Sequence, residues 1–242
     1  MSPKNREAFF KALAEAMPSP KSELEHCTPY ELLVAVILSA QATDKGVNVA
    51  TRNLFPVANT PQKMVKLGEE GLTEYIKTIG LFRGKARNVI GMSGILVEEH
   101  GGKVPKTREA LERLPGVGRK TANVVLNVAF GEPTIAVDTH VFRVSNRTGL
   151  APGKDVLEVE EKLLKVVPRK YLMNAHHYLI LHGRYTCLAQ KPLCWKCPVY
   201  EQCGFPGRRK FAALDPAKPT PAPRVLPKGK AGTKASRKAA RR

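Results

Sequence analysis

Lys120, Asp138 and a group of four cysteines are the residues whose types and spacing could support chemistry. Lys120 follows the turn Pro115-Gly116-Val117-Gly118, and Asp138 precedes Thr139-His140. A lysine is a nucleophile only as the free amine, so its pKa must fall well below the ordinary value of about 10.4. A carboxylate opposite that amine can stabilise a cationic sugar or carry a proton. The pair predicts covalent chemistry on a sugar carbon, with Lys120 as nucleophile and Asp138 as its partner.

The residues around Lys120 predict a helical hairpin that binds phosphate. Residues 107–114 have a helical pattern, residues 115–118 form a turn, and a second helix follows as far as Gly131. The two glycines of the turn allow positive φ and expose backbone N–H groups at a helix N-terminus, which suits a phosphate oxygen. Such a contact does not read base sequence. The residues expected to contact a DNA backbone are Gly116, Val117, Gly118 and Arg119.

Each of these residues also has an ordinary structural interpretation. The hairpin could connect two core helices, and Lys120 could be a solvated lysine aimed at phosphate. Asp138 could be the N-cap of the helix that begins at Thr139, because Asp is a preferred capping residue. The sequence does not measure the separation of Lys120 and Asp138, so both interpretations stay open.

The cysteines Cys187, Cys194, Cys197 and Cys203 follow the pattern C-x6-C-x2-C-x5-C. Four thiolates in so short a span predict metal ligation. Zinc and iron–sulfur clusters both accept four cysteines. Zinc sites more often contain two C-x2-C pairs and this chain contains one, so the spacing favours iron–sulfur and leaves zinc as the alternative. Lys191 in this loop is a candidate phosphate contact, and Cys27 is interpreted as a buried free thiol.

The charge of the chain indicates a polyanionic partner. Its 242 residues include 40 Lys and Arg against 21 Asp and Glu, a formal net charge of +19. Nucleic acid fits that balance better than a membrane does. Residues 211–242 carry +8 of this charge and are rich in proline, so we expect residues 208–242 to be a disordered basic tail that adds sequence-independent DNA affinity. With no signal peptide and no apolar run long enough for a membrane span, the sequence predicts a cytoplasmic protein.

The hydrophobic pattern predicts an all-α fold. Residues 32–38 are continuously apolar and read as a buried helix. Residues 134–137 are the only segment that looks extended. Helix starts are expected from caps at Thr28, Asp44, Thr60, Thr107 and Asp155, and after Gly84.

Together these residues resemble the endonuclease III family of DNA glycosylases. The matching segments are residues 38–44, 114–130, 135–143 and 182–187 with the three cysteines that follow. The resemblance implies two helical domains with a DNA-binding cleft between them. One comprises residues 22–131 and includes the helix-hairpin-helix motif at about 107–131. The other joins residues 1–21 to residues 132–207 and holds a 4Fe-4S cluster on the four cysteines.

The resemblance also implies a reaction: a bifunctional DNA glycosylase with AP lyase activity that removes oxidised pyrimidines in base excision repair. The partner is double-stranded DNA with damaged pyrimidines or abasic sites, bound by a monomer. The nucleotide is flipped out of the stack, Lys120 attacks C1′ to give a Schiff base with the help of Asp138, and β-elimination cuts the strand. By the same resemblance Gln41 fills the gap in the stack, Leu81 is a wedge, and His140 reaches a phosphate or the site.

Two alternatives remain at this level. A monofunctional glycosylase of the same fold would lack the lysine and carry a further recognition domain. A non-catalytic DNA-binding module would explain the charge and the cysteines, but would leave Lys120 and Asp138 without a role.

Overall fold

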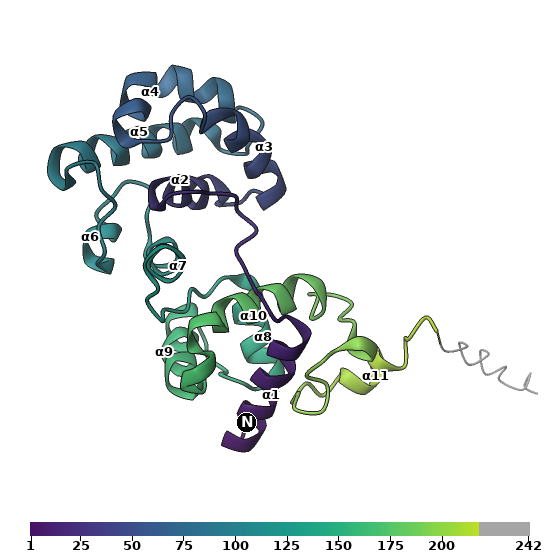
Figure 1. Ribbon diagram of the computed structural model, residues 1–242. Coiled ribbons are helices and arrows are strands. Elements are labelled where there is room, and N and C mark those ends of the chain that lie inside the picture. Colours follow the sequence, from purple (N-terminus) through teal and green to yellow (C-terminus); the bar gives the residue numbers. More distant parts are fainter. Residues whose placement is uncertain (218–242) are drawn as a thin grey trace, which may run out of the picture.

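The structure is a computed structural model that describes residues 1–217, and these residues are helical, with no strand (Figure 1). This confirms the predicted all-α class. No helix in this part of the chain is long and apolar enough to cross a membrane. The helices are α1 (Pro3–Ala16), α2 (Pro29–Ser39), α3 (Asp44–Leu54), α4 (Pro61–Ile76), α5 (Phe82–His100), α6 (Arg108–Glu112), α7 (Arg119–Phe130), α8 (Thr139–Thr148), α9 (Val156–Val166), α10 (Leu172–Tyr185) and α11 (Arg208–Ala212), with short 3-10 helices η1 (Arg169–Tyr171) and η2 (Cys194–Lys196).

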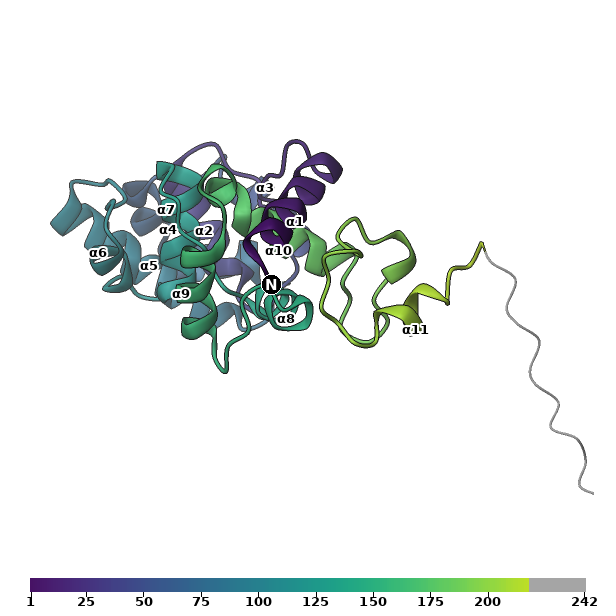
Figure 2. The same ribbon diagram turned by 90° about the horizontal axis from the view of Figure 1, so that it is seen from below.

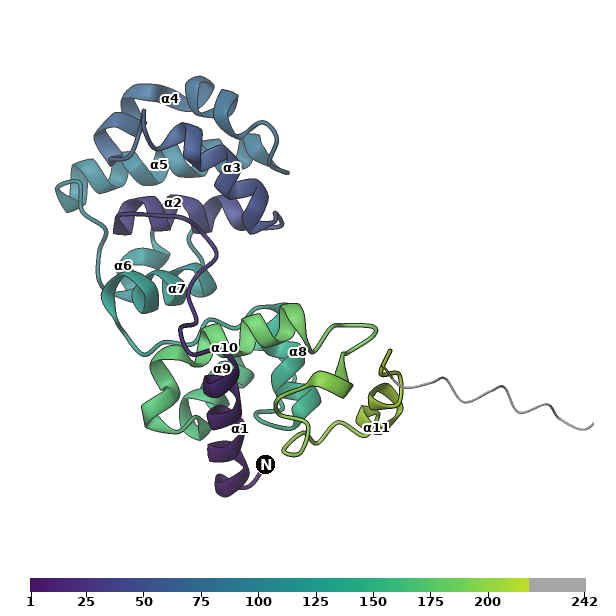
Figure 3. The same ribbon diagram turned by 45° about the vertical axis from the view of Figure 1, so that its right-hand side comes forward.

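The buried apolar side chains form two separate clusters, here called the first core and the second core. The first core is built from α2–α7 and extends from Leu24 to Ala136. The second core joins α1 to side chains between Ile135 and Val199. In Figures 1 and 3, α2–α5 lie at one end, α1 and α8–α10 at the other, and α7 between them. The domain boundaries stated above remain predictions.

Local capping rules account for most helix starts. Thr28 and Glu31 form the predicted capping box, with Glu31 N donating to Thr28 Oγ1 at 3.1 Å and Thr28 N donating to Glu31 Oε2 at 3.2 Å. Caps at Thr60, Thr107 and Asp155 are also confirmed. Two predicted starts are wrong. Thr43, not Asp44, caps α3, and α5 begins at Phe82, so Gly84 lies inside the helix.

Residues 135–137, called the seam below, pass between the two cores. The side chains of Ile135 and Val137 enter the second core, and that of Ala136 enters the first. This alternation is typical of extended backbone, although no strand pairs with it among the described residues. Side chains of α7 supply hydrogen bonds just before the seam, because Asn127 Nδ2 donates to the carbonyls of Glu132 at 3.1 Å and Thr134 at 3.2 Å.

The chain after the cysteines is ordered further than we predicted. Residues 208–212, expected to be disordered, form α11, because Phe211 stacks on Phe205 at 6.1 Å and the Arg208 guanidinium lies 5.3 Å from the Tyr200 ring. Figure 2 shows α11 at the opposite end of the molecule from α6. Residues 213–217 of the predicted tail are also described, and residues 218–242 lie outside the described residues. Cys27, predicted to be buried, is exposed, because it precedes α2 on the surface.

Candidate active site

Lys120 is the second residue of α7, and its side chain is exposed. Gly118 is the N-cap and provides no side-chain cap, so the first N–H groups of α7 are open to an anion. Gly116 has a φ of 78°, and a Cβ there would lie 2.9 Å from Asn88 Cβ, so the turn can pack on α5 only with glycine. Gly118 has a φ of −98°. Only one of the two glycines therefore uses the left-handed region that we expected of both.

Two neighbours of Lys120 that we expected to contact DNA have partners within the protein. The Val117 side chain is buried in the first core, and its N–H donates to the Leu114 carbonyl at 3.1 Å. Arg119 binds Glu160 of α9 through Nε at 3.0 Å and Nη2 at 2.9 Å, an interaction that raises the pKa of the guanidinium. Arg119 therefore ties the hairpin to the second core, and its DNA contact stays a prediction.

Asp138 is the N-cap of α8, as its structural interpretation predicted. Its Oδ1 accepts hydrogen bonds from His140 N at 2.9 Å and Val141 N at 2.8 Å. The positive end of the helix dipole stabilises a carboxylate in this position. Both bonds end on the same oxygen, so capping engages only half of the carboxylate and is compatible with a second role for Asp138.

One buried side chain lies near both Lys120 and Asp138. Burial and the neighbouring His177 lower the pKa of His176 to about 4, the Asp138 charge acts against this shift, and the Lys120 charge adds to it. Two geometric observations place His176 of α10 near both residues. Lys120 and His176 line one cavity, and the His176 ring binds the carbonyl of Ala136, two residues before Asp138.

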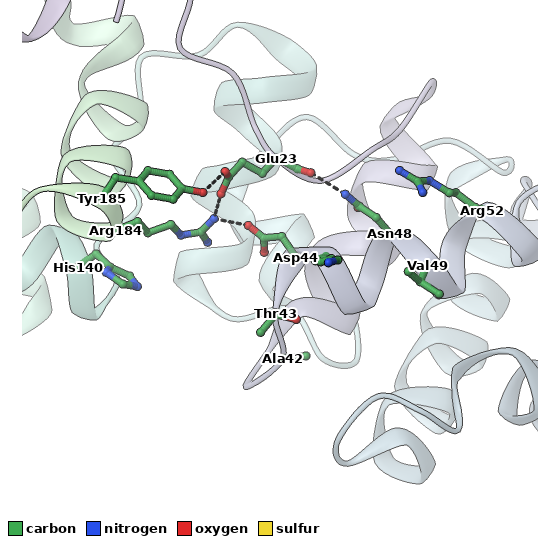
Figure 4. A pocket seen from close by; sticks show the side chains of 11 residues that line it. Glu23, Ala42, Thr43, Asp44, Asn48, Val49, Arg52, His140, Arg184 and Tyr185 are labelled. Carbon is green, nitrogen blue, oxygen red and sulfur yellow. Dashed lines mark hydrogen bonds and ion pairs between the residues drawn. The ribbon is translucent and has the colours of Figure 1, made fainter. Parts of the chain in front are cut away.

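A cleft with a volume of about 620 Å³ lies between α3 and the C-terminal end of α10. Figure 4 shows the side chains that line it. Within it, the Arg184 guanidinium lies between the carboxylates of Glu23 and Asp44, and the Tyr185 hydroxyl donates to Glu23. Glu23, Arg184 and Tyr185 are site residues that the sequence did not lead us to predict. Arg184 and Tyr185 lie just before Cys187, and this position was the only signal for them. No neighbouring motif marks Glu23.

A smaller cavity of about 60 Å³ adjoins this cleft, and Lys120 is one of the residues that line the smaller cavity. The cavity shares Glu23, Asp44 and Arg184 with the larger cleft, and it is also lined by Lys120 and His176. Lys120 therefore lies beside a cleft whose Glu23, Asp44 and Arg184 side chains offer hydrogen-bond donors and acceptors to a polar planar ring.

Gln41 and Leu81 are the only non-glycine residues among residues 1–217 with positive φ, at 54° and 62°. The Leu81 side chain is 66% exposed. A Cβ on Gly80 would lie 3.9 Å from the Gln41 carbonyl oxygen, so the two turns are adjacent. Strained backbone of this kind costs about 1–3 kcal/mol per residue and clusters at functional sites. The two residues predicted to enter the DNA stack thus form one exposed, strained projection.

The other predicted contact residues lie at the edges of the site. His140 lines the large cleft, and its Nδ1 lies 3.1 Å from Arg143 Nη2. Lys191 is exposed on the cysteine loop. Their contacts with DNA remain predictions.

The four cysteines lie in one loop beside α8, with N–H donors near their sulfurs. Arg147 Nη1 lies 3.6 Å from Cys187 Sγ, and Phe205 N lies 3.4 Å from Cys203 Sγ. Burial raises the pKa of the Cys197 thiol to about 12 and also raises those of Cys194 and Cys203. Within residues 1–217, no three His, Cys, Asp or Glu side chains are arranged to hold a metal ion.

Arginines of α8 attach the cysteine loop to the helix that Asp138 caps. Arg147 donates to the carbonyls of Leu188 at 2.6 Å and Ala189 at 2.8 Å, and Arg143 Nε donates to the Cys187 carbonyl at 3.0 Å. Displacement of the loop would therefore be transmitted along α8 to Asp138.

Comparisons with known proteins agree with this geometry. The family model described as HhH-GPD superfamily base excision DNA repair protein matches residues 34–169. Endonuclease III of Haemophilus influenzae is 60% identical over 211 residues, which are 87% of this chain and 100% of the relative. Endonuclease III of Escherichia coli K12 is 60% identical over 205 residues, 85% of this chain and 97% of the relative.

A solved structure of a trapped endonuclease III–DNA covalent intermediate superimposes with a TM-score of 0.81 at 44% identity, covering 87% of this chain and 99% of that one. The chain therefore belongs to the endonuclease III family of the HhH-GPD superfamily, base excision DNA repair enzymes with DNA glycosylase and AP lyase activity.

Proposed function

We propose that this chain releases oxidised pyrimidines from double-stranded DNA and cuts the resulting abasic strand, with Lys120 as the nucleophile. The supporting observation is the position of Lys120. Lys120 is exposed at the uncapped start of α7 and lines, with His176, a cavity next to the polar cleft, and His176 binds the backbone two residues before Asp138. A lysine that served only to contact phosphate would need neither the cleft nor the carboxylate.

DNA binds across the hairpin and the adjacent strained turns. The open N–H groups of α7 donate hydrogen bonds to a backbone phosphate. Leu81 enters the stack as an apolar wedge, and Gln41 occupies the space that the flipped nucleotide leaves. The exposed fraction of Leu81, 66%, leaves its side chain accessible for this insertion.

The flipped base lies in the cleft with Glu23, Asp44 and Arg184. A ring-saturated or oxidised pyrimidine presents amide N–H donors and carbonyl acceptors on one edge. The carboxylates accept from the donors, and the guanidinium donates to the carbonyls. Arg184 must then exchange one of its bonds with Glu23 or Asp44 for a bond to the base.

The reaction itself has two stages. The Lys120 amine attacks C1′, the electrons of the glycosidic bond leave with the base, and the base takes up a proton. Loss of the amine proton and opening of the sugar ring give a Schiff base. Removal of a C2′ proton then expels the 3′ phosphate as the C3′–O bond breaks. The Asp138 carboxylate stabilises the positive charge that develops on the sugar and the iminium.

The four cysteines Cys187, Cys194, Cys197 and Cys203 hold a 4Fe-4S cluster. Four thiols in one loop, with Arg147 and backbone N–H groups near the sulfurs, suit such a cluster, because hydrogen bonds to sulfur are part of its usual environment. On these four ligands the cluster would hold the loop together, and Arg143 and Arg147 attach the loop to α8. Iron and acid-labile sulfide analysis with a visible absorption spectrum tests this, and stoichiometric zinc without iron would contradict it.

Borohydride trapping tests the proposed reaction. The protein is incubated with a duplex that contains one oxidised pyrimidine and is then reduced, which converts a Schiff base into a stable adduct. We expect an adduct with the wild type and none with Lys120→Gln. Lys45→Gln is a matched control, because Lys45 is an exposed lysine that lines the larger cleft next to the cavity of Lys120.

The alternatives give different results in the same assay. Base release without an adduct would indicate a monofunctional glycosylase. DNA binding with neither base release nor adduct would indicate a non-catalytic module. An adduct that persists in Lys120→Gln would show that another amine is the nucleophile.

A further inference from the structure

The two proposed reactive groups belong to different cores, so the relative position of Lys120 and Asp138 is not set by either core alone. Lys120 lies in the first turn of α7, whose apolar face packs in the first core, and Asp138 caps α8, whose apolar face packs in the second. The chain between the two helices runs through the seam. The backbone of residues 135–137 must therefore be held firmly if the carboxylate is to stay beside the amine.

Hydrogen bonds hold this connection at several points. Asn127 of α7 donates to the carbonyls of Glu132 and Thr134, and the Thr134 hydroxyl donates to the Asn123 carbonyl at 2.6 Å. These bonds fasten the part of the connection that is nearest to α7. The seam itself, where the chain crosses to the second core, needs a partner on the other side.

That partner is His176 of α10. Its Nδ1 lies 2.9 Å from the Ala136 carbonyl oxygen, and the residue is 4% exposed. Ala136 is two residues before Asp138, so this is the last side-chain bond to the backbone before the carboxylate. A buried carbonyl oxygen without a hydrogen-bond partner would cost about 1–3 kcal/mol. Because no strand pairs with the seam among the described residues, the His176 ring supplies the partner of the Ala136 carbonyl.

The chemistry of the ring agrees with a donor role. Burial lowers the pKa of His176 to about 4, so the ring is neutral at physiological pH and carries a single N–H. A carbonyl oxygen can only accept. The proton must therefore be on Nδ1, and the ring is fixed in one tautomer that donates to Ala136.

We propose that His176 is a positioning residue of the glycosylase and lyase reactions, whose Nδ1–H holds the Ala136 carbonyl and thereby keeps Asp138 beside Lys120. His176 acts through the seam and does not act on the substrate. The inference depends on the proposed roles of Lys120 and Asp138 and adds to them the residue that aligns the pair across the two cores.

His177 provides an internal comparison. It is the next residue of α10, is 9% exposed and packs edge-on against His176 with ring centroids 5.2 Å apart. Its Nδ1 is buried and makes no hydrogen bond within residues 1–217. It shares the burial and aromatic packing of His176 but not the bond to the seam.

The test compares His176→Asn with His176→Leu. The two new side chains have similar size, but only Asn carries an N–H donor, at about the position of Nδ1. The measurement is the single-turnover rate of base release and of borohydride adduct formation with enzyme in excess. The Kd for DNA with an uncleavable abasic-site analogue and the melting temperature are measured in parallel.

We expect His176→Leu to slow both steps by about 10- to 100-fold, because a shift of about 1 Å in a reacting group can cost about 100-fold. Its Kd should change little, because the DNA contacts are elsewhere. His176→Asn should recover most of the rate. His177→Phe, which keeps the ring packing, should react like the wild type.

Three kinetic results would overturn the proposal: a wild-type rate for folded His176→Leu, an Asn variant as slow as the Leu variant, or an equal loss in His177→Phe. If the Leu variant does not fold, nitrogen-15 NMR of the histidine rings in the wild type decides. An Nδ1–H proton on His176 that exchanges slowly supports the proposal, and the Nε2–H tautomer overturns it. A wild type that forms no adduct would instead refute the proposed function.

Discussion

The first and second cores are built by different means. The first core joins helices that are consecutive in the chain, and α2 passes through it with residues 32–38 buried. The second core joins α1 to helices far along the chain. There α10 buries three histidines, His176, His177 and His182, and Arg143 and Arg147 attach the cysteine loop. Apolar burial maintains the first core, whereas the second core also contains buried histidines and hydrogen bonds from arginine side chains to the cysteine loop.

The largest expected effect is the selective loss of the second core when a cysteine is removed. Cys197→Ser should prevent cluster assembly, and because the ligands staple a loop with little apolar surface, α1, α8 and α10 should lose protection from hydrogen exchange. Helix α2 should keep its protection. Hydrogen exchange measured by mass spectrometry tests this prediction. A uniform loss of protection over both cores would show that the two cores do not differ in their dependence on the cysteine loop.

A substitution in the first core tests the role of apolar burial there. Leu33 is fully buried there, and Leu33→Ala should lower the free energy of unfolding by about 2–5 kcal/mol through lost burial and the cavity left behind. Urea unfolding measures the change. Leu157→Ala, at a side chain that is 44% exposed, is the control and should stay within about 0.5 kcal/mol of the wild type. Equal effects would contradict the burial argument.

Acid should weaken the second core before the first. His176 has a pKa of about 4 in the folded protein against an ordinary value of 6.5, so the unfolded chain binds the proton more readily. The stability from the neutral ring is complete above about pH 6.5 and is lost as pH falls toward 4, by up to about 3 kcal/mol. Urea unfolding across this range should give a flatter pH profile for His176→Asn than for the wild type. Parallel profiles would rule out this contribution.

The smallest effect concerns the strained turn at the edge of the first core. Leu81→Gly should raise the free energy of unfolding by up to about 1 kcal/mol, because glycine adopts a φ of 62° without strain. The same change should weaken binding to DNA that contains an abasic-site analogue, because the wedge is lost. Thermal melting and a binding titration measure the two quantities. A destabilised Leu81→Gly would show that the left-handed backbone at this position is not strained.

Features that depend on neighbours in the chain could be predicted well. Thr28, Thr60, Thr107 and Asp155 cap helices as expected, because an N-cap bonds to N–H groups two or three residues away. The start of α5 could not be predicted in this way. It depends on the left-handed conformation of Leu81 beside the Gln41 turn, and that contact joins segments far apart in the chain.

The residues of the candidate site also differ in whether the local sequence indicates them. Lys120, Asp138 and the four cysteines are recognisable from residue type and spacing. Arg119 also stood out, but its guanidinium is bound to Glu160, a partner that no local pattern indicates. Glu23 and Arg184 carry no motif, and they form a site because the chain between α1 and α2 meets the end of α10.

Most helix starts and the basic charge are thus readable from the order of amino acids, because they follow from local hydrogen bonding, periodicity and composition, and residue type and spacing nominate the candidate reactive residues. The seam between the cores, the donor role of His176 and the polar cleft depend on the folded chain. They consist of contacts between side chains that are distant in sequence, and packing in three dimensions is what brings those side chains together.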